Sequence, residues 1–436
     1  MGFKDQYKHY SQQIPKDIQR SLDGGTCPVL GFTSNLDVLL EWDEGAFNAI
    51  ADRYLTEQPA IRNNDTIHSI EDFARIISAY VIRGQGGEVD ITDNAVCTFL
   101  ENHFRNRYAL GGTAAQGATA LNTLGFPVLV HISDRSQEVC QLMDRPGIST
   151  VTESGLVPII QAASAELPVR HIILQFPKGA KIRIQNETVE IPQSNRVIMD
   201  YDSIHKNLII DENFRQYCEE HAGKLPCYAI SGFNAIVDTE IMQSVIRDTI
   251  AHLQAIKARN PGCIIYLEAA HYLNPAVEEI VFSQMAPHID ILGLNEEELT
   301  LHARQHQTEI HPEDPASVLA GLRCFRQRYS IRGLLLHTKD YSLYFGEELA
   351  NADITKGLTI GNLIAGTRAR IGRYGTWQDC LETLSQPLSP TGLAFHDTLT
   401  AMEPDIQIVP SRYIENPGCM IGLGDTFMAG VLTAFL

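Results

Sequence analysis

The chain has 436 residues, of which 44% are hydrophobic, so it can bury a large core and is long enough for one large domain and a smaller one. Asp and Glu number 53 against 34 Lys and Arg, and the formal net charge of −19 argues against nucleic acid or an anionic membrane as a partner. The apolar runs are strand-sized and the start of the chain lacks an apolar signal core. We therefore expect a cytoplasmic protein.

The first predicted elements lead to a pair of polar residues. Residues 7–22 have the pattern of a polar helix interrupted at Pro15, and a short apolar strand follows at 28–32. Asn35 and Asp37 come directly after this strand. Because the carboxyl ends of parallel strands face the ligand crevice, the two side chains are candidates for binding a polyhydroxyl substrate. An Asx turn is the simpler explanation of the same residues.

Amphipathic helical patterns fill residues 39–108, with a glycine-rich interruption at 83–90. This interruption is either a flexible loop or a place where the backbone and Glu88 close on a ligand. Further along, Gly111 and Gly112 open an Ala-rich helix. Such a start indicates that a ligand, or a tightly packed neighbouring strand, lies close to the N-terminus of that helix.

Residues 171–199 change to short alternating strands joined by a Pro-Lys-Gly turn at 177–179, a pattern typical of an antiparallel β insertion. The insertion carries the basic residues Lys178, Lys181, Arg183 and Arg196. These side chains are candidates for binding a phosphate, although solvated strand faces commonly carry such charges.

After residue 227, buried strands alternate with helices, which predicts a doubly wound, mostly parallel sheet covered on both faces. Three of these strands end in polar residues: Glu268, Asn295 with Glu298, and His337 with Thr338. Carboxylates at such strand ends suit Mg²⁺, which keeps several waters and accepts few protein ligands. Ordinary helix capping explains the acidic run at 295–298 without any metal.

Two glycines, Gly422 and Gly424, precede an apolar helix at the end of the chain, and Asp425 follows them. Glycines let the backbone approach a ligand closely, and the free N–H groups of a helix N-terminus attract an anion. A carboxylate beside such an anion hole can take a proton while the N–H groups stabilise a transferring phosphoryl group. A role for Asp425 as an ordinary helix cap is the alternative.

The order of these motifs resembles the ribokinase superfamily of sugar kinases and, more closely, the ADP-dependent glucokinase and phosphofructokinase family. The resemblance runs from about residue 30 to residue 436 and is carried by segments 31–37, 111–112, 176–179, 195–196, 230–233, 293–298, 337–338, 416–417 and 422–426. It implies a ribokinase-like α/β domain and a smaller α+β lid domain formed by insertions. We expect the large, nucleotide-binding domain at 1–36, 109–168 and 228–436, and the lid at 37–108 and 169–227.

The resemblance also implies roles for single residues. Asp425 matches the family's catalytic base, and the backbone amides of Gly422, Leu423 and Gly424 match the site that holds the phosphoryl group. Candidates for sugar binding are Asn35, Asp37, Glu88, Gly112 and Lys178. Candidates for nucleotide binding are Arg196, Asn295, His337, Thr338 and Gly424. Magnesium would be organised by Glu268, Glu298 and Asp425.

These residues predict an ADP-dependent sugar kinase that transfers the β-phosphoryl group of ADP to a hexose, gives AMP and uses Mg²⁺. Glu88 favours glucose, since a carboxylate accepts hydrogen bonds from hydroxyls and repels a sugar phosphate. Fructose 6-phosphate stays open as the acceptor, because its phosphate could be bound by Lys178, Lys181 and Arg183. In one departure from the family, Tyr266 stands where a His-x-Glu motif usually has its histidine, which puts rate or metal preference in question.

Two alternatives remain at this stage. One is an ATP-dependent ribokinase-like kinase for a sugar or a nucleoside, and the other, motivated by Tyr266, is a non-catalytic protein that senses a sugar or nucleotide. As partners we expect small-molecule substrates only, with the chain a monomer or a homodimer. A kinase of this kind should also close its lid about the regions of residues 36, 108, 166 and 227.

Overall fold

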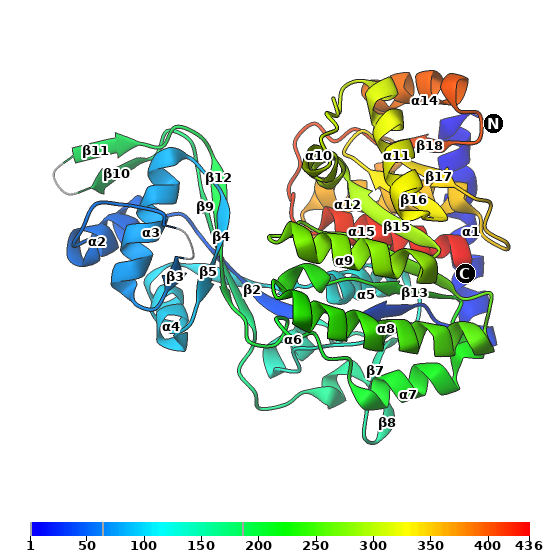
Figure 1. The fold of residues 1–436 in the computed structure, drawn as a ribbon, viewed down its shortest axis with the longest axis horizontal. Coiled ribbons are helices and arrows are strands. Elements are labelled where there is room, and N and C mark those ends of the chain that lie inside the picture. The colour runs from blue at the N-terminus through cyan, green and yellow to red at the C-terminus, as the bar shows by residue number, and fades with distance from the viewer. Residues whose placement is uncertain (1, 63–64, 185–186) are drawn as a thin grey trace.

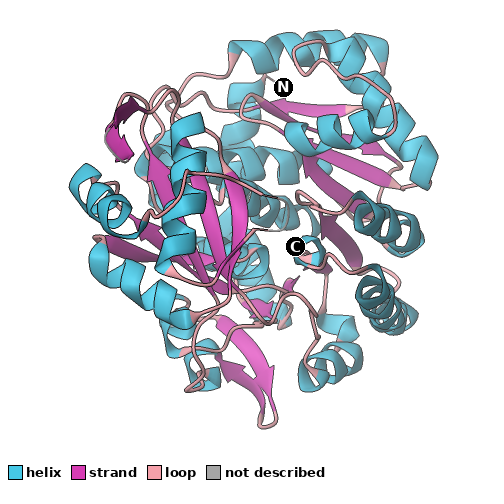
Figure 2. Cartoon of the chain, turned by 60° about the vertical axis from the view of Figure 1, so that its left-hand side comes forward, coloured by secondary structure: helices cyan, strands magenta, loops and turns pink. Residues whose placement is uncertain are grey.

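A computed structural model describes residues 2–62, 65–184 and 187–436. The chain forms two lobes, each built on its own β-sheet, and the two sheets are joined by segments that cross between the lobes (Figure 1). The larger lobe holds both ends of the chain. Figure 2 shows the smaller lobe turned toward the viewer, with its sheet beside the larger one.

The larger sheet has ten strands in the order β18-β17-β16-β15-β14-β13-β1-β6-β7-β8. Neighbours from β16 to β7 are parallel, and the edge strands β17, β18 and β8 are antiparallel. The strands are β1 (Val29–Gly31), β6 (Val128–Val130), β7 (Ile148–Thr152), β8 (Gly155–Pro158), β13 (Cys227–Ile230), β14 (Ile264–Glu268), β15 (Ile291–Asn295), β16 (Gly333–His337), β17 (Tyr341–Gly346) and β18 (Gln407–Pro410).

Helices cover both faces of this sheet, because its central strands are apolar on both sides. Leu335 of β16 belongs to one apolar cluster, whereas its neighbours Leu334 and Leu336 belong to the other. The first cluster includes helices α1 (Phe3–Gly24), α5 (Thr113–Leu124), α12 (Ile354–Ile371) and α15 (Leu423–Val431). The second includes α7 (Glu212–Glu220), α8 (Thr239–Arg259), α9 (Pro275–Met285), α10 (Glu296–Gln305), α11 (Pro315–Tyr329) and α14 (Pro390–Met402). The predicted doubly wound, mostly parallel sheet is thus confirmed.

The smaller sheet has six strands in the order β3-β4-β12-β9-β2-β5. They are β2 (Asn35–Leu40), β3 (Thr66–Ile67), β4 (Gly87–Ile91), β5 (Asn106–Gly111), β9 (Arg170–Phe176) and β12 (Asn195–Tyr201). Helices α2 (Glu44–Tyr54), α3 (Ile70–Arg83) and α4 (Asn94–His103) lie on the side away from the larger lobe (Figure 1). A separate hairpin of β10 (Lys181–Ile184) and β11 (Glu187–Glu190) contacts α2. The second, smaller sheet formed by insertions is therefore present.

Two local expectations were wrong. The first helix is not interrupted at Pro15 but runs through it, because Tyr7 and Ile14 are buried and Asp17 pairs with Lys356 of α12 at 2.8 Å. The glycine-rich segment at 83–90 is not only a loop. Gly84 ends α3, and residues from Gly87 onward form β4, where pairing with β12 outweighs the weak strand preference of glycine.

The division into domains stays a proposal. The smaller sheet draws on strands within 35–111 and 170–201, close to the two insertions expected from the sequence. Helix α7, which lies inside the second expected insertion, packs against α8 and β7 of the larger lobe. We therefore place the return to the larger lobe before α7. No described helix is both long and apolar enough to cross a membrane.

Candidate active site

The N-terminus of α15 carries the glycine-rich turn. Gly422 is its N-cap with φ +68°, in the left-handed region that favours glycine. A Cβ atom there would also overlap Gln116 and Arg368. Asp425 lies in the first helical turn. Burial raises the pKa of Asp425, while the Thr113 hydroxyl and the Arg368 charge oppose that rise. The helix start is thus shaped as an anion hole with a carboxylate beside it.

Glu268, at the end of β14, is held by two partners. Its Oε1 atom lies 2.9 Å from Nε2 of His337, and its Oε2 atom accepts a hydrogen bond of 2.7 Å from the hydroxyl of Tyr266. Tyr266 is fully buried, and any side chain at Gly293 would overlap both Tyr266 and Glu268. Tyr266 therefore donates to Glu268 and orients it, so the unusual residue leaves the carboxylate fixed rather than loose.

Asn295 and Glu298 form a reciprocal capping box at the start of α10. The Asn295 side chain accepts from the backbone N–H of Glu298, and Glu298 accepts from the backbone N–H of Asn295, each at 2.9 Å. Burial, together with the nearby charge of Glu268, raises the pKa of Glu298 to about 7. Two buried carboxylates that repel each other are a setting that a divalent cation relieves, so capping and metal binding are compatible here.

A cavity of about 460 Å³ opens beside these residues. Its lining includes four of the predicted nucleotide-binding residues, namely Asn295, His337, Thr338 and Gly424. The wall is largely apolar, and the His337 ring lies 5.0 Å from the ring of Phe427. The volume of this cavity and its largely apolar lining suit a nucleoside that makes a few polar contacts. Arg196, the fifth predicted nucleotide residue, lies on the smaller sheet and is not part of this wall.

The pairing of strands β2 and β5 explains why the glycine pair at 111–112 is needed. The Nδ2 atom of Asn35 donates to Oδ1 of Asp37 at 2.7 Å, and Asn35 pairs with Gly111 across β2 and β5. A Cβ atom on Gly111 would overlap both Asn35 and Asp37, and Gly112 has φ +86° with Thr33 and Ser34 against it. The glycines therefore make room for Asn35 and Asp37 at the base of the smaller sheet.

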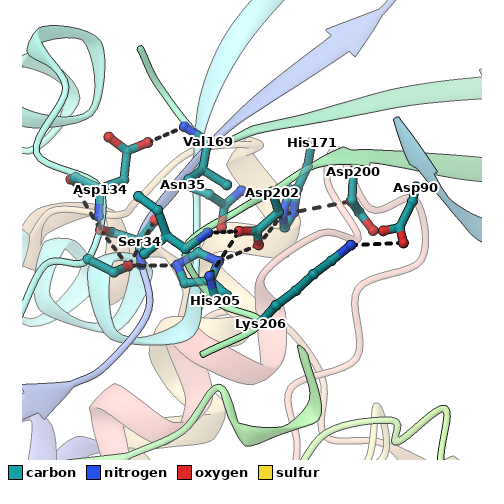
Figure 3. Close-up of polar contacts among 12 residues, drawn as sticks. Ser34, Asn35, Asp90, Asp134, Val169, His171, Asp200, Asp202, His205 and Lys206 are labelled. Carbon is teal, nitrogen blue, oxygen red and sulfur yellow. Dashed lines mark hydrogen bonds and ion pairs between the residues drawn. The ribbon is translucent and has the colours of Figure 1, made fainter. Parts of the chain in front are cut away.

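A polar row continues from Asp37 across the smaller sheet. His171 of β9 is opposite Asp37, and Asp200 of β12 is opposite His171, so the three share one face. Figure 3 shows His171 and Asp200 side by side. Burial alone would lower the pKa of His171, but the charges of Asp200, Asp202 and Asp37 outweigh it and raise that pKa to about 9. His171 is thus a cation among carboxylates at neutral pH.

A hydrogen-bonded chain links this row to the larger lobe. Asp202 contacts His205 at 2.6 Å, the other ring nitrogen of His205 lies 2.6 Å from the Ser133 hydroxyl, and Ser133 accepts from the backbone N–H of Ser34 at 3.0 Å (Figure 3). His171 lies 3.7 Å from Asp202. The chain spans the point where the main chain passes from one sheet to the other.

Glu88 and Arg196 lie on the same face as this row. Glu88 of β4 pairs with Ile198 of β12. Ile198 lies two residues along β12 from both Asp200 and Arg196, and residues two apart on a strand point to the same face. Burial raises the pKa of Asp37, and the charge of Arg196 lowers it while that of Asp425 raises it. Asp37 is therefore within electrostatic reach of both Arg196 in the smaller lobe and Asp425 in the larger lobe.

The structure does not bring Lys178 to this group. Lys178 is exposed in the turn after β9, at the end of that strand remote from His171. Arg183 pairs with Asp52 of α2 at 2.6 Å, and Lys181 begins the hairpin that contacts α2. Lys181 and Arg183 thus belong to the α2 side of the smaller lobe, whereas Lys178 lies at the same end of the sheet as Arg196, with its backbone N–H donating to the Ser194 hydroxyl at 2.8 Å.

Sequence reasoning missed several residues of the site. Thr113, Gln116, His171, Asp202, His205, Arg368 and Arg412 were not singled out for any role. Gln116 and Arg368 sit within helical patterns that look like ordinary amphipathic helix, and no local motif marks them. His171 had a signal, since a histidine that opens an apolar strand is unusual, but only the strand pairing shows that it meets Asp37.

Comparison with known proteins identifies the family. Residues 28–434 match the model described as the ADP-specific phosphofructokinase/glucokinase conserved region. The chain belongs to this family. The resemblance inferred from the motifs, and the expectation of an ADP-dependent sugar kinase family whose members are phosphotransferases, are thereby confirmed.

Relatives in the ADP-specific phosphofructokinase/glucokinase family carry different names. An ADP-dependent glucose/glucosamine kinase of Pyrococcus abyssi is 25% identical over 409 residues, which cover 88% of this chain and 86% of that protein. An ADP-specific phosphofructokinase of the same organism is 23% identical over 93% of this chain and 96% of that protein. A solved ADP-dependent kinase complex with fructose-6-phosphate and ADPbetaS has a TM-score of 0.77 at 17% identity, covering 99% and 97%. The family is clear, and its two substrate branches are about equally distant.

Proposed function

We propose that the chain transfers the β-phosphoryl group of ADP to glucose, giving AMP and a sugar phosphate. The observation that carries the choice of sugar is the charge of the smaller sheet's cleft face. Asp37, Glu88, Asp90 and Asp200 lie on it. Asp90 pairs with Lys206 at 2.9 Å, and Asp37 and Asp200 share His171 at 4.0 and 3.7 Å, which leaves Glu88 without an ion pair among the described residues. A row of carboxylates accepts hydrogen bonds from the hydroxyls of a neutral sugar and repels a sugar that already carries a phosphate.

The proposed acceptor end of the reaction lies between the lobes. Asn35 and Asp37 would hold the sugar hydroxyls, with Gly112 at the start of α5 close behind them, and Glu88 would reach the far side of the ring. Asp425 would take the proton of the attacking hydroxyl, and it lies within electrostatic reach of Asp37. Closure of the lobes would remove water and bring the hydroxyl to the base.

The proposed donor end lies at α15 and the adjoining cavity. Asn295, His337 and Thr338 line the space that suits the nucleoside, and the free N–H groups of Gly422, Leu423 and Gly424 would hold the phosphoryl group. Arg196 faces the cleft from the smaller lobe and would reach the phosphates on closure. Little more than positioning and charge stabilisation is required for this transfer.

The carboxylates of this end fit Mg²⁺. Both oxygens of Glu268 already have partners, so Glu268 would hold the ion through water, whereas one oxygen of Glu298 caps the backbone of Asn295. Asp425 completes an acidic trio within electrostatic reach of Glu268. When bound, Mg²⁺ would neutralise charge on the phosphates.

Fructose 6-phosphate is the second candidate acceptor. Arg196 supports it, because this cation faces the cleft and could pair with a sugar phosphate. The similarity to proteins named phosphofructokinase supports it as well. Against it, Arg183 pairs with Asp52 of α2, and Lys181 begins the hairpin that contacts α2.

An acceptor and donor screen tests the proposal. Purified enzyme with Mg²⁺ would be given glucose, glucosamine or fructose 6-phosphate, each with ADP or ATP, and AMP and sugar phosphate would be measured. We expect turnover with ADP and the highest kcat/KM with glucose. Preference for fructose 6-phosphate would overturn the acceptor, preference for ATP would overturn the donor, and binding without turnover would favour a sensing protein.

A further inference from the structure

Arg368 of α12 is a buried cation placed directly beneath the glycine-rich turn. Only 8% of the residue is exposed. Its Nη1 atom donates to the carbonyl oxygen of Gly422 and to the hydroxyl of Thr426, each at 2.8 Å, and its Nη2 atom donates to Oε1 of Gln116 at 2.8 Å. The ring of Tyr374 covers the guanidinium at 4.3 Å. The guanidinium group of Arg368 is therefore fixed in one orientation.

These contacts tie together the two helices that begin at the site. Gln116 lies in the first turn of α5, just after Gly112, while Gly422 and Thr426 flank the first turn of α15. A bond lost between Arg368 and either helix would free that helix start to shift. Since a displacement of about 1 Å costs on the order of 100-fold in rate for a positioned reaction, this geometry bears on catalysis.

Close packing of two helices keeps Arg368 within reach of the turn. A Cβ atom on Gly430 of α15 would lie 2.6 Å from the Cα atom of Gly361 of α12, so the backbones touch where these glycines meet. A shorter or neutral side chain at 368 would remove one donor from the Gly422 carbonyl, which keeps the N–H and hydroxyl of Thr426, and would leave Gln116 Oε1 with only the longer bond of 3.4 Å from the Tyr374 hydroxyl.

The charge of Arg368 has no paired carboxylate. Among the described residues, no acidic side chain lies within 4.0 Å of its guanidinium, although buried cations are usually paired. Its charge does act on Asp425, the residue next to the anion hole. An unpaired buried cation behind an anion-binding turn is suited to a ligand that brings negative charge.

We infer that Arg368 is the positioning residue of the phosphoryl site, locking the Gly422–Asp425 turn to α5 and supplying the fixed positive charge behind the transferring group. This rests on the proposed transfer at α15 but not on which sugar accepts. Arg368 acts through the turn and α5, so its loss should lower kcat much more than it raises the KM for the sugar.

Arg370, two residues along the same helix, provides a matched control. It also makes three hydrogen bonds, to the Thr383 hydroxyl, the Asp379 carbonyl oxygen and Glu382, and all lie on α13 (Trp377–Thr383) rather than α15. Arg370→Met thus removes an equivalent set of contacts from α12 without touching the turn.

The experiment compares kcat and both KM values of wild type, Arg368→Met, Arg368→Lys and Arg370→Met, with whichever hexose the wild type uses best and with folded fractions from thermal unfolding. We expect Arg368→Met to lose about 100-fold in kcat with the sugar KM within about threefold, the scale of a lost anion-hole donor. Arg368→Lys should recover about tenfold, and Arg370→Met should stay within about twofold of wild type. Equal kcat losses in the two Met variants, or wild-type kcat in Arg368→Met, would overturn the inference.

A further variant covers the case in which Arg368→Met does not fold. Gln116→Met removes one partner of the guanidinium and keeps the charge, and we expect its kcat to fall about tenfold at an unchanged sugar KM. An unchanged kcat in this folded variant would overturn the link to α5. A wild type inactive with every hexose would instead contradict the proposed function, so the two failures are distinguishable.

Discussion

The two sides of the cleft hold their polar groups in different ways. On the larger lobe, Glu268 and Glu298 are buried and each has hydrogen-bond partners on fixed strands or helix starts. On the smaller lobe, Glu88 and Arg196 are exposed on the face of a sheet. Under the proposed function, this difference places the chemistry in a rigid frame and the choice of sugar on exposed side chains, where a substitution costs little stability.

The largest effect is expected from removing the proposed base. Asp425→Ala should lower kcat by about 10³-fold or more, because a general base contributes on the order of 10²–10⁴. Sugar and nucleotide affinities should change little, since the turn around it stays intact. Steady-state kinetics and calorimetric binding check this, and a variant that keeps its activity would remove Asp425 from the proposed mechanism.

The metal site should give the next largest effect. Glu298→Gln keeps an amide oxygen for the capping bond to Asn295 but loses the charge, so we expect the Mg²⁺ concentration for half-maximal rate to rise about 10- to 100-fold. Glu309→Gln, at an exposed position after α10, is the control and should not shift it. A magnesium titration that superimposes on wild type would contradict the assignment.

Sugar preference tests the other side of the cleft. Glu88→Gln removes a cleft carboxylate, so we expect the KM for glucose to rise about tenfold and the discrimination against fructose 6-phosphate to weaken, with kcat nearly unchanged. Lys178→Ala should leave the KM values for both sugars within about twofold of wild type, because Lys178 is exposed beyond the end of β9 that is remote from His171. A large effect of Lys178→Ala on fructose 6-phosphate alone would instead favour a phosphosugar acceptor.

The smallest effect concerns pH and stability. The pKa of His171 in the folded chain is about 9, above the ordinary 6.5, so its charge stabilises the fold fully below pH 6.5 and loses this effect as pH rises from 6.5 to 9. Urea unfolding of wild type and His171→Gln should therefore differ by about 1 kcal/mol more at pH 6 than at pH 9.5, after a discount for partial exposure. A constant difference for His171→Gln would contradict the assigned charge.

The predictable parts of the fold are those with a local signal. The alternation of buried strands and helices after residue 227 marked β13 to β16 correctly, and the glycines of the last turn marked the start of α15. Strand β4 was missed because Gly86 and Gly87 resemble a loop, and only pairing with β12 makes the segment a strand. Local propensity cannot report such a non-local partner.

The residues of the candidate site likewise divide into those that have a local sequence signal and those that do not. Asn35, Asp37, Glu268, Asn295 and Asp425 stand at strand or helix ends, where sequence pattern places them, and in the structure Asp425 is within electrostatic reach of both Asp37 and Glu268. Arg368 and Gln116 are 252 residues apart and meet only because three helices pack together. Lys178 has the right chemistry for a phosphate, and its role in sugar binding stays a prediction; it is exposed in the turn after β9, at the same end of the sheet as Arg196.

One measurement tests most directly the proposed division of roles between the two lobes. It is the ratio of kcat/KM for glucose to that for fructose 6-phosphate, in wild type, Asp425→Ala and Glu88→Gln. We predict that Asp425→Ala lowers both values equally and leaves the ratio unchanged, because proton removal is common to both acceptors. Glu88→Gln should lower the ratio about tenfold while keeping kcat. A shifted ratio in Asp425→Ala, or an equal loss of kcat with both sugars in Glu88→Gln, would contradict the separation of chemistry and sugar choice between the two lobes.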